Sequence, residues 1–139
     1  LLHFWQSCGF ELVQITPTAE ASSGYQSAMM LYPISEQGKY FVQKARKQFE
    51  RDYPLLHGHD GAMDLDEQDR QNLYGFAYGQ RTFLACYASL KRLFNQYPKE
   101  LHLLESAFSQ PYGELPPNYK LWVRQIRQAV QNLNLFQVR

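Results

Sequence analysis

The hydrophobic pattern of the sequence changes at Pro33, and this change restricts the folds that the chain can adopt. Before Pro33, the apolar residues of 1–8 recur at the spacing of one helical face, Gly9 ends that segment, and residues 11–16 and 25–33 have the composition of short strands. After Pro33, the main apolar segments all have helical spacing. The sequence therefore predicts an α+β fold in which a helix and two strands precede a mainly α-helical region.

Residues 25–33, YQSAMMLYP, are apolar at odd and even positions alike, which predicts a strand that is buried on both faces. One helix end and two strands do not enclose a core by themselves. The chain also begins without a methionine, in the middle of the predicted helix–strand unit. We therefore expect the partners of these first elements to lie upstream of residue 1.

Capping residues predict where the first helices of the second region begin. Ser35 is placed to cap a helix that runs to about Asp52, and Asp66 is placed to cap a helix that runs to about Tyr78. Gly75 lowers the helix propensity of the second segment. The apolar face of the first of these helices is expected to consist of Phe41, Val42, Ala45 and Phe49.

Three further helices are expected in the remainder of the chain. They cover residues 82–97, a short segment that begins at Pro98, and residues 118–136. Their inward faces are expected to be Phe83, Tyr87, Leu90 and Phe94; then Leu101, Leu104 and Phe108; and finally Trp122, Ile126, Val130 and Leu133.

Charge divides the chain at nearly the same place as the hydrophobic pattern. Residues 1–34 contain two acids, Glu11 and Glu20, and no Lys or Arg, so their net charge is −2. Residues 35–139 hold all 14 basic residues and the other 11 acids, so their net charge is +3. This asymmetry predicts two domains with different roles, 1–34 and 35–139.

Composition also bears on where such a protein works. No run of about 18 apolar residues occurs, so no membrane span is expected, and no basic-then-apolar leader opens the chain. The two cysteines, Cys8 and Cys86, are too few for a disulfide framework. They predict two buried, reduced thiols in a cytoplasmic protein.

Basic residues recur at helical spacing on two of the predicted helices, in each case opposite the apolar face. The 40–51 stripe consists of Tyr40, Lys44, Lys47 and Arg51, and the 120–131 stripe consists of Lys120, Arg124, Arg127 and Gln131. No acid occurs from Leu115 to the end of the chain. Unopposed cations in such rows suit a phosphate backbone, because each can replace a condensed counterion. A solvated helix face is the alternative.

Three tyrosines extend the nucleic-acid hypothesis. Tyr40, Tyr112 and Tyr119 can stack on unpaired bases, as aromatic residues do on RNA-binding surfaces. The alternative is that they are half-buried packing residues.

No catalytic group can be assigned from the sequence, and no metal site is expected. The loop HGHDGAMDLD, residues 57–66, contains metal-ligating types, but its glycines favour a flexible acidic loop: His57, His59, Asp60, Asp64 and Asp66. The acids at 64–69 are better explained as a charge cluster at the start of a helix, where the helix dipole favours them. Ser22 and Ser23 lack the surroundings of a nucleophile elbow.

Two longer segments resemble a known enzyme family. The run LHFWQSCGFELVQITPTAEASSGYQSAMMLYPIS is similar to the closing part of a GNAT-type acetyltransferase domain, in which a late helix ends at Gly-Phe and two antiparallel strands complete the sheet. With a helical tail that contains GFAYGQR at 75–81, it resembles more narrowly the C-terminal part of bacterial tRNA(Met) cytidine acetyltransferases. The resemblance is strong over about residues 1–35 and looser in the tail.

The resemblance implies a large parent protein. Members of this family acetylate the wobble cytidine of elongator tRNA(Met), use acetyl-CoA, and hydrolyse ATP with Mg. It implies ATPase and acetyltransferase modules upstream, and a helical tail that helps to hold tRNA. The family often has an arginine that contacts CoA where this chain has Ser7. The family's pyrophosphate loop and ATPase motifs have no counterpart here, so this chain alone is expected to bind no cofactor and to transfer no acetyl group.

Two alternatives remain open at the level of the sequence. One is that the chain is the end of another GNAT-type acetyltransferase, which acts on a small amine or a protein. The other is that the helical tail is an interaction module that docks on its own upstream domains.

Overall fold

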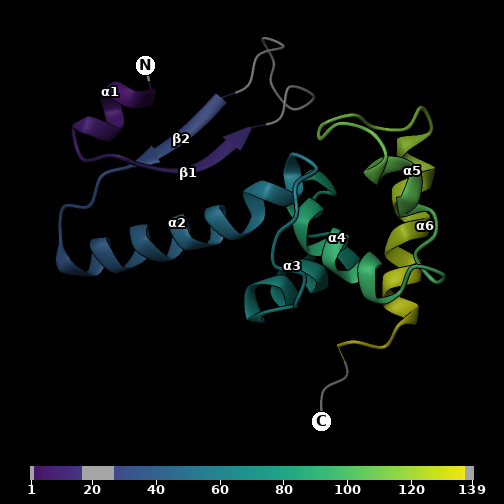
Figure 1. Ribbon diagram of the computed structural model, residues 1–139. Helices are drawn as coiled ribbons and strands as arrows, with labels where there is room; N and C mark the ends of the chain where they lie inside the picture. Colours follow the sequence, from purple (N-terminus) through teal and green to yellow (C-terminus); the bar gives the residue numbers. More distant parts are fainter. Residues whose placement is uncertain (1, 17–26, 137–139) are drawn as a thin grey trace.

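The computed structural model describes residues 2–16 and 27–136 of the 139-residue chain. It is an α+β structure in which a short helix and a two-stranded sheet precede a group of helices (Figure 1). The first elements are α1 Leu2–Ser7, β1 Glu11–Thr16 and β2 Ser27–Leu31. The start of the strand predicted over 25–33, together with Ser22 and Ser23, lies outside the described residues.

The two strands are antiparallel, as the resemblance implies. Glu11 pairs with Leu31 and Ile15 pairs with Ala28, and the register shifts once, between Leu12 and Gln14. Gly9 has a φ of 95°, a left-handed conformation that glycine adopts without strain, and it reverses the chain between α1 and β1. This helix end was predicted from the sequence.

The helices that follow are close to the predicted ones. They are α2 Glu36–Leu56, α3 Glu67–Ala77, the 3₁₀ turn η2 Leu84–Cys86, α4 Tyr87–Gln96, α5 Leu104–Phe108 and α6 Tyr119–Asn132. The helix expected from Pro98 forms only at its end, as α5, because the residues before it make isolated turns. The helix expected over 82–97 is divided between η2 and α4.

Both predicted caps are confirmed. The Ser35 hydroxyl accepts a hydrogen bond of 2.9 Å from the Gly38 amide at the start of α2. Asp66 and Asp69 form a capping box at the start of α3, in which each carboxylate accepts from the other residue's amide, at 2.8 and 3.0 Å. Each cap satisfies amides that would otherwise lack a partner in the first helical turn.

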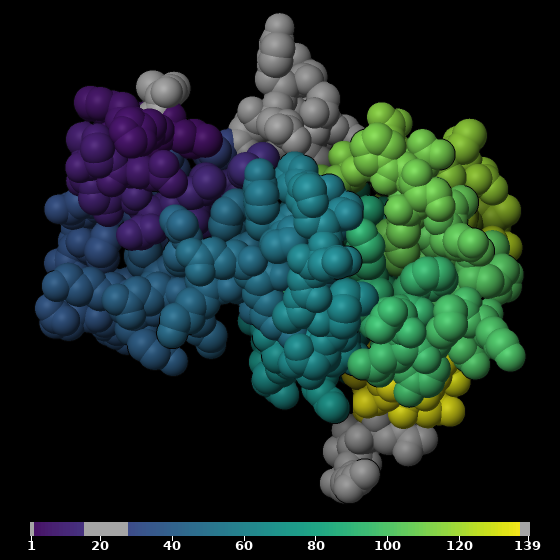
Figure 2. Space-filling model, in the orientation of Figure 1, coloured from purple at the N-terminus to yellow at the C-terminus, as the bar shows by residue number. Residues whose placement is uncertain are grey.

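The sheet packs on α2, and together they form an arm that extends from the main body of helices (Figure 2). Val42 is buried on α2, and Arg46 forms an ion pair of 3.0 Å with Glu11 of β1. Phe41, which was predicted to face inward, is 58% exposed, so that prediction is wrong. The reason is geometric, because the sheet covers one side of α2 and the helical body contacts only the end of α2, so the other side of its first half is uncovered among the described elements (Figure 1).

Two burial predictions for the first elements are also wrong. Met29 in the middle of β2 is 51% exposed, so β2 is not buried on both faces among the described residues. Cys8 is exposed, because α1 contains no buried residue, whereas Cys86 is buried as predicted. A two-stranded sheet has too few neighbours to cover both of its faces.

The main hydrophobic cluster lies among the helices after α2, and Leu56 at the end of α2 packs against it. The cluster is built by α3, η2, α4, the segment 101–107 and α6. Trp122, Ile126 and Val130 of α6 face this core, as predicted, and Phe83 packs edge-on against Trp122 with ring centroids 4.9 Å apart. The division into domains 1–34 and 35–139 stays a prediction, since β1 also contacts α2.

A buried ionic network joins four segments of the helical body. Asp69 of α3 and Arg92 of α4 are both 0% exposed and are joined by a bond of 2.7 Å. Arg92 also donates to the Asp52 carboxylate, the Ala62 carbonyl and the Arg51 carbonyl, at 2.7, 2.7 and 3.0 Å. The network thus connects α2, the 57–66 loop, α3 and α4.

Asp69 has enough partners to remain charged in the core. Burial by itself raises the pKa of Asp69, but bonds from the Asp66 amide and the Ser89 hydroxyl, with the charges of Arg92 and Arg51, hold that pKa below its ordinary value. The Ser89 hydroxyl donates at 2.7 Å and the Arg51 guanidinium at 2.7 Å. A buried charge is tolerable only when it is paired and hydrogen-bonded in this way.

Asp69→Asn is expected to lower the free energy of unfolding at pH 7 by about 3 kcal/mol, because it leaves the buried Arg92 without part of its countercharge. Urea unfolding measures this loss. The depressed pKa of Asp69 means that its contribution is complete above its unfolded pKa of about 4 and disappears as the pH falls through its lower folded value. The difference between variant and wild type should therefore shrink below about pH 4.

Glu36→Gln is the matched control, because Glu36 belongs to an exposed ion pair with Lys39. It should leave the unfolding midpoint unchanged. Equal effects of the two substitutions would contradict the role given to Asp69.

Candidate nucleic-acid interface

The 120–131 stripe runs along α6 and ends against the end of α3. Lys120 and Arg124 are exposed. Arg127 is half-buried, with its guanidinium 5.0 Å from the centre of the Phe76 ring, and it donates a bond of 3.0 Å to the Arg81 carbonyl. Gln131 donates a bond of 2.7 Å to the Ala77 carbonyl. The first two residues of the stripe face solvent, and the last two fasten α6 to α3.

Arg81 adds a further cation at this place. A Cβ on Gly75 would lie 2.9 Å from Cδ of Arg81, so the missing side chain of Gly75 allows Arg81 to lie across α3. The charges of Arg81 and Arg127 both act on the Cys86 thiol beneath them, although burial dominates and raises the pKa of Cys86 to about 12. The segment GFAYGQR (75–81) therefore has a structural role, in which Gly75 makes room for the side chain of Arg81.

Five exposed or half-buried cations lie on α3, on α6 and on the turn between α3 and η2. They are Arg70, Arg81, Lys120, Arg124 and Arg127, and we call the surface that carries them the α3–α6 basic face. The sequence has no Asp or Glu from Arg70 to Lys99, nor from Leu115 to the end. The first of these acid-free runs was missed by the sequence analysis, although it is visible there and would have identified Arg70 and Arg81.

The 40–51 stripe is only partly available. Tyr40 is 63% exposed, and Lys44 and Lys47 are exposed and form no ion pair within the part of the chain that the structure describes. Arg51 was predicted to belong to this unopposed stripe, and that prediction is wrong. The Arg51 side chain is 17% exposed and reaches three acids instead: Asp64 at 3.3 Å, Asp66 at 3.6 Å and Asp69 at 2.7 Å.

The acidic cluster at 64–69 explains this difference. Burial lowers the pKa of Arg51, but its bond to Asp69 and the charges of Asp69, Asp66 and Asp64 more than offset that effect and raise it. Asp64 and Asp66 are therefore both in ion pairs with Arg51. Among the described residues, no group of three or more His, Cys, Asp or Glu side chains is placed to hold a metal ion.

Two of the three tyrosines that were considered for base stacking are used in packing. The Tyr112 hydroxyl donates a bond of 3.2 Å to the Leu84 carbonyl, and its ring packs edge-on against Tyr87. Tyr119 is half-buried, with its ring 6.0 Å from that of Trp122. Both are half-buried packing residues, which was the alternative to base stacking. Of the three tyrosines, only Tyr40 is exposed.

Ser7 lies at the end of α1, far in sequence from the α3–α6 basic face. Its hydroxyl donates a bond of 2.6 Å to the Phe4 carbonyl in the same helix. No described residue of 1–34 is a lysine or arginine. A role for Ser7 in cofactor binding stays a prediction.

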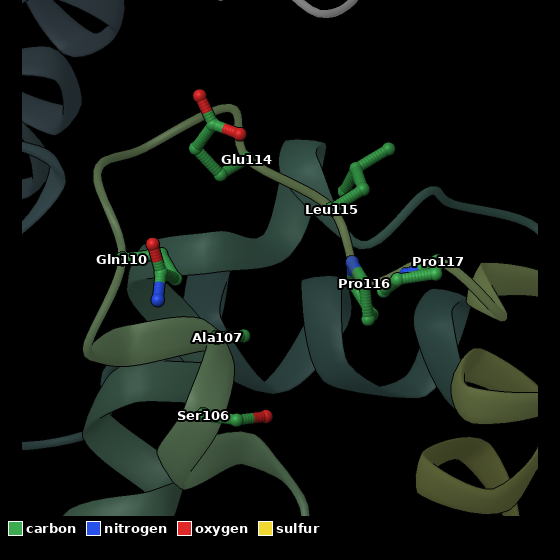
Figure 3. A pocket seen from close by; sticks show the side chains of 7 residues that line it. All are labelled: Ser106, Ala107, Gln110, Glu114, Leu115, Pro116 and Pro117. Carbon is green, nitrogen blue, oxygen red and sulfur yellow. The ribbon is translucent and has the colours of Figure 1, made fainter.

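The cavities of the protein are shallow and give little sign of an anion site. One, of about 240 Å³, lies between α5 and the loop before α6, and its only charged lining residue is Glu114 (Figure 3). The Glu114 carboxylate disfavours a phosphate there. A groove of about 340 Å³ between β1, α2 and η2 has Arg81 at its edge. None of the described helices combines the length and apolarity needed to cross a membrane.

Comparison with known proteins agrees with a nucleic-acid interface. The model of the tRNA-binding domain family matches residues 38–114, which include nearly all of α2 and the whole of α3, α4 and α5. The chain belongs to this family. In the tRNA-binding domain described here, Lys44, Lys47, Arg70 and Arg81 lie inside the matched range, whereas α6 lies beyond it.

Two proteins from other bacteria show what this chain is similar to. The tRNA(Met) cytidine acetyltransferase TmcA of Haemophilus ducreyi is 49% identical over 94% of this chain and 23% of its own length. The protein of that name from Actinobacillus pleuropneumoniae is 46% identical over 95% of the chain and 24% of its own length. The resemblance found in the sequence is thereby confirmed, and the chain spans about a quarter of the length of these relatives.

Arg127→Gln is expected to lower the free energy of unfolding by about 1–2 kcal/mol, because it removes the contact with the Phe76 ring and the bond to Arg81. Arg124→Gln, on the same stripe but exposed, should leave it unchanged. Urea unfolding of the two variants measures the free energy of unfolding, and so distinguishes Arg127, which holds α6 against α3, from Arg124, which is exposed. A loss of equal size in both would contradict this distinction.

Proposed function

We propose that this tRNA-binding domain holds tRNA on the α3–α6 basic face, with Lys44 and Lys47 of α2 as a second contact. The observation that carries the proposal is the α3–α6 basic face itself, whose five cations lie on two contacting helices and the adjoining turn, within two acid-free parts of the sequence. Phosphate contacts of this kind provide most of the affinity of nucleic-acid-binding proteins and fix the position of the ligand. The family match and the names of the relatives agree with tRNA as the ligand.

The cations of the face differ in what they can do. Lys120 and Arg124 are exposed and mobile enough to follow a phosphate backbone, whereas Arg127 is fixed by Phe76 and the Arg81 carbonyl. Fixed cations set the register of a bound strand, and mobile ones add affinity through counterion release. The face therefore suits the positioning of a structured RNA.

For the whole protein we propose the activity printed in the relatives' names, tRNA(Met) cytidine acetylation. In this proposal the chain is the C-terminal part of a cytoplasmic enzyme that modifies the wobble cytidine of elongator tRNA(Met) with acetyl-CoA and ATP. Residues 1–34 are the closing helix and strands of a GNAT-type domain, residues 35–139 are the tRNA-binding tail, and the ATPase module lies upstream. The contribution of the tail is orientation, which is a large part of the catalysis of a direct transfer.

We propose that residues 1–34 do not by themselves hold the pyrophosphate of acetyl-CoA. Residues 1–34 contain no lysine or arginine for its pyrophosphate, and the Ser7 hydroxyl is already bonded within α1. We therefore derive no step of acetyl transfer from this chain, and we propose that the cofactor is held by other parts of the whole protein.

The salt dependence of tRNA binding tests the proposal. Replacing Lys120 and Arg124 together by Gln should weaken binding of an unmodified elongator tRNA(Met) transcript, and should make the plot of log K against log salt less steep by about 1.5, because each lost phosphate contact removes about 0.7–0.9 from the slope. Fluorescence anisotropy at several salt concentrations measures both quantities.

The matched control removes the same charge elsewhere. Lys39→Gln with Arg46→Gln deletes two cations of α2 that are already in ion pairs with Glu36, Glu11 and Glu50. Its slope should stay that of the wild type. If the Lys120 and Arg124 variant kept the wild-type slope, the α3–α6 basic face would not be the tRNA contact.

A further inference from the structure

Three aromatic rings from distant parts of the sequence meet on the surface of the helical body. Tyr74 and Tyr78 are one turn apart on α3 and its cap, with ring centroids 4.8 Å apart. Phe136, which follows α6, packs edge-on at 5.5 Å from Tyr74 and lies 6.5 Å from Tyr78. We call Tyr74, Tyr78 and Phe136 the aromatic cluster.

The two tyrosines of the aromatic cluster lie outside the core, and Phe136 is half-buried against it. Tyr74 is 47% exposed and Tyr78 is 53% exposed, whereas Phe76, between them in sequence, is 0% exposed. The alternation follows from the helix, because Leu73, Phe76 and Ala77 face inward and Tyr74 and Tyr78 face outward. The outer rings therefore touch one another and present a broad π surface to solvent.

On α3, the exposed charged residue nearest in sequence to the aromatic cluster is a cation, as expected at a nucleic-acid site. Arg70 lies one turn before Tyr74, on the same face of α3. It is exposed and forms no ion pair with any residue that the structure describes. Glu67, the exposed acid of α3, lies at the start of the helix, three residues before Arg70, while Asp69 is buried in the ionic network. Beyond Arg70, the helix and the turn that follows it contain no acid.

We propose that the aromatic cluster is a stacking platform for an unpaired nucleotide of an RNA loop. The proposal rests on the proposed function, since the α3–α6 basic face would hold the adjacent phosphates. Every base has a π face, so aromatic rings bind unpaired nucleotides of any sequence, while bases inside a duplex are stacked on each other and cannot reach such rings. The platform thereby makes the domain prefer a looped RNA to a plain duplex.

Placement supports a nucleotide over an apolar protein partner. The Arg127 guanidinium lies 5.0 Å from the centre of the Phe76 ring, and its Nη1 would lie 3.4 Å from a Cβ on Gly79, the residue after Tyr78. A cation therefore lies beside the turn that follows Tyr78. This combination of a ring and a cation matches a base together with its phosphate.

The test compares two RNA probes on the full 139-residue chain. One is a hairpin with a seven-nucleotide loop that carries 2-aminopurine, and the other is a blunt duplex with the same number of phosphates. Tyr78→Ala removes a ring of the platform, and Tyr78→Phe keeps it. Tyr53→Ala is the matched control, because Tyr53 is a partly exposed α2 tyrosine, paired with His57 at 4.3 Å.

Tyr78→Ala is expected to weaken hairpin binding about 10-fold, to leave duplex binding unchanged, and to relieve the quenching of 2-aminopurine. The salt slope for the hairpin should not change, because no cation is removed. Tyr78→Phe and Tyr53→Ala should bind both probes as the wild type does. Tyr74→Ala provides a second truncation, and thermal unfolding by circular dichroism confirms that each variant is folded.

The outcomes separate the two proposals. If the wild type binds both probes with a steep salt dependence but Tyr78→Ala and Tyr74→Ala bind the hairpin unchanged, the platform is wrong and the proposed function stands. An equal loss for hairpin and duplex also overturns the platform, since stacking would not affect the duplex. If the wild type binds neither probe, the proposed function and the platform both fail.

Discussion

The buried contact between Asp69 and Arg92 determines much of the rest of the structure. Both side chains are 0% exposed, and their bonds draw together α2, the 57–66 loop, α3 and α4. The same network takes up Asp52, Asp64 and Asp66, through Arg92 and Arg51. Four carboxylates are thereby paired with two arginines inside or at the edge of the body. A chain whose formal net charge is only +1 can thus present surfaces that are strongly basic.

This internal pairing explains why the two predicted stripes differ in how many of their cations remain free of ion pairs. Arg51 is used by the network, so the 40–51 stripe keeps Lys44 and Lys47 as free cations. The 120–131 stripe has no acids near it in sequence and remains available, with Arg127 and Gln131 fastening it to α3. The α3–α6 basic face and the aromatic cluster are therefore neighbours on one helix, with phosphate and base contacts beside each other.

The features of the fold that were predicted correctly depend on neighbouring residues in the sequence. Ser35, Asp66 and Gly9 marked helix ends because caps and glycine stops depend on adjacent residues, and the inward face of α6 followed from its 3.6-residue period. The failures all involve distant partners. Arg51 pairs with acids that lie 13 to 18 residues further along the chain, and Arg92 pairs with Asp52, 40 residues before it. Phe41 is exposed because no distant segment packs on it, which the helical period of the sequence does not reveal. The aromatic cluster likewise needs Phe136 to return to α3.

The most direct measurement is photo-crosslinking of the chain to elongator tRNA(Met) that contains 4-thiouridine, followed by mass spectrometry of the linked peptides. The account predicts crosslinks in the peptides that cover 70–81 and 119–132, including α6, which lies beyond the family match. Crosslinks confined to α1, β1 and β2, with none in those two peptides, would contradict the claim that the α3–α6 basic face holds tRNA.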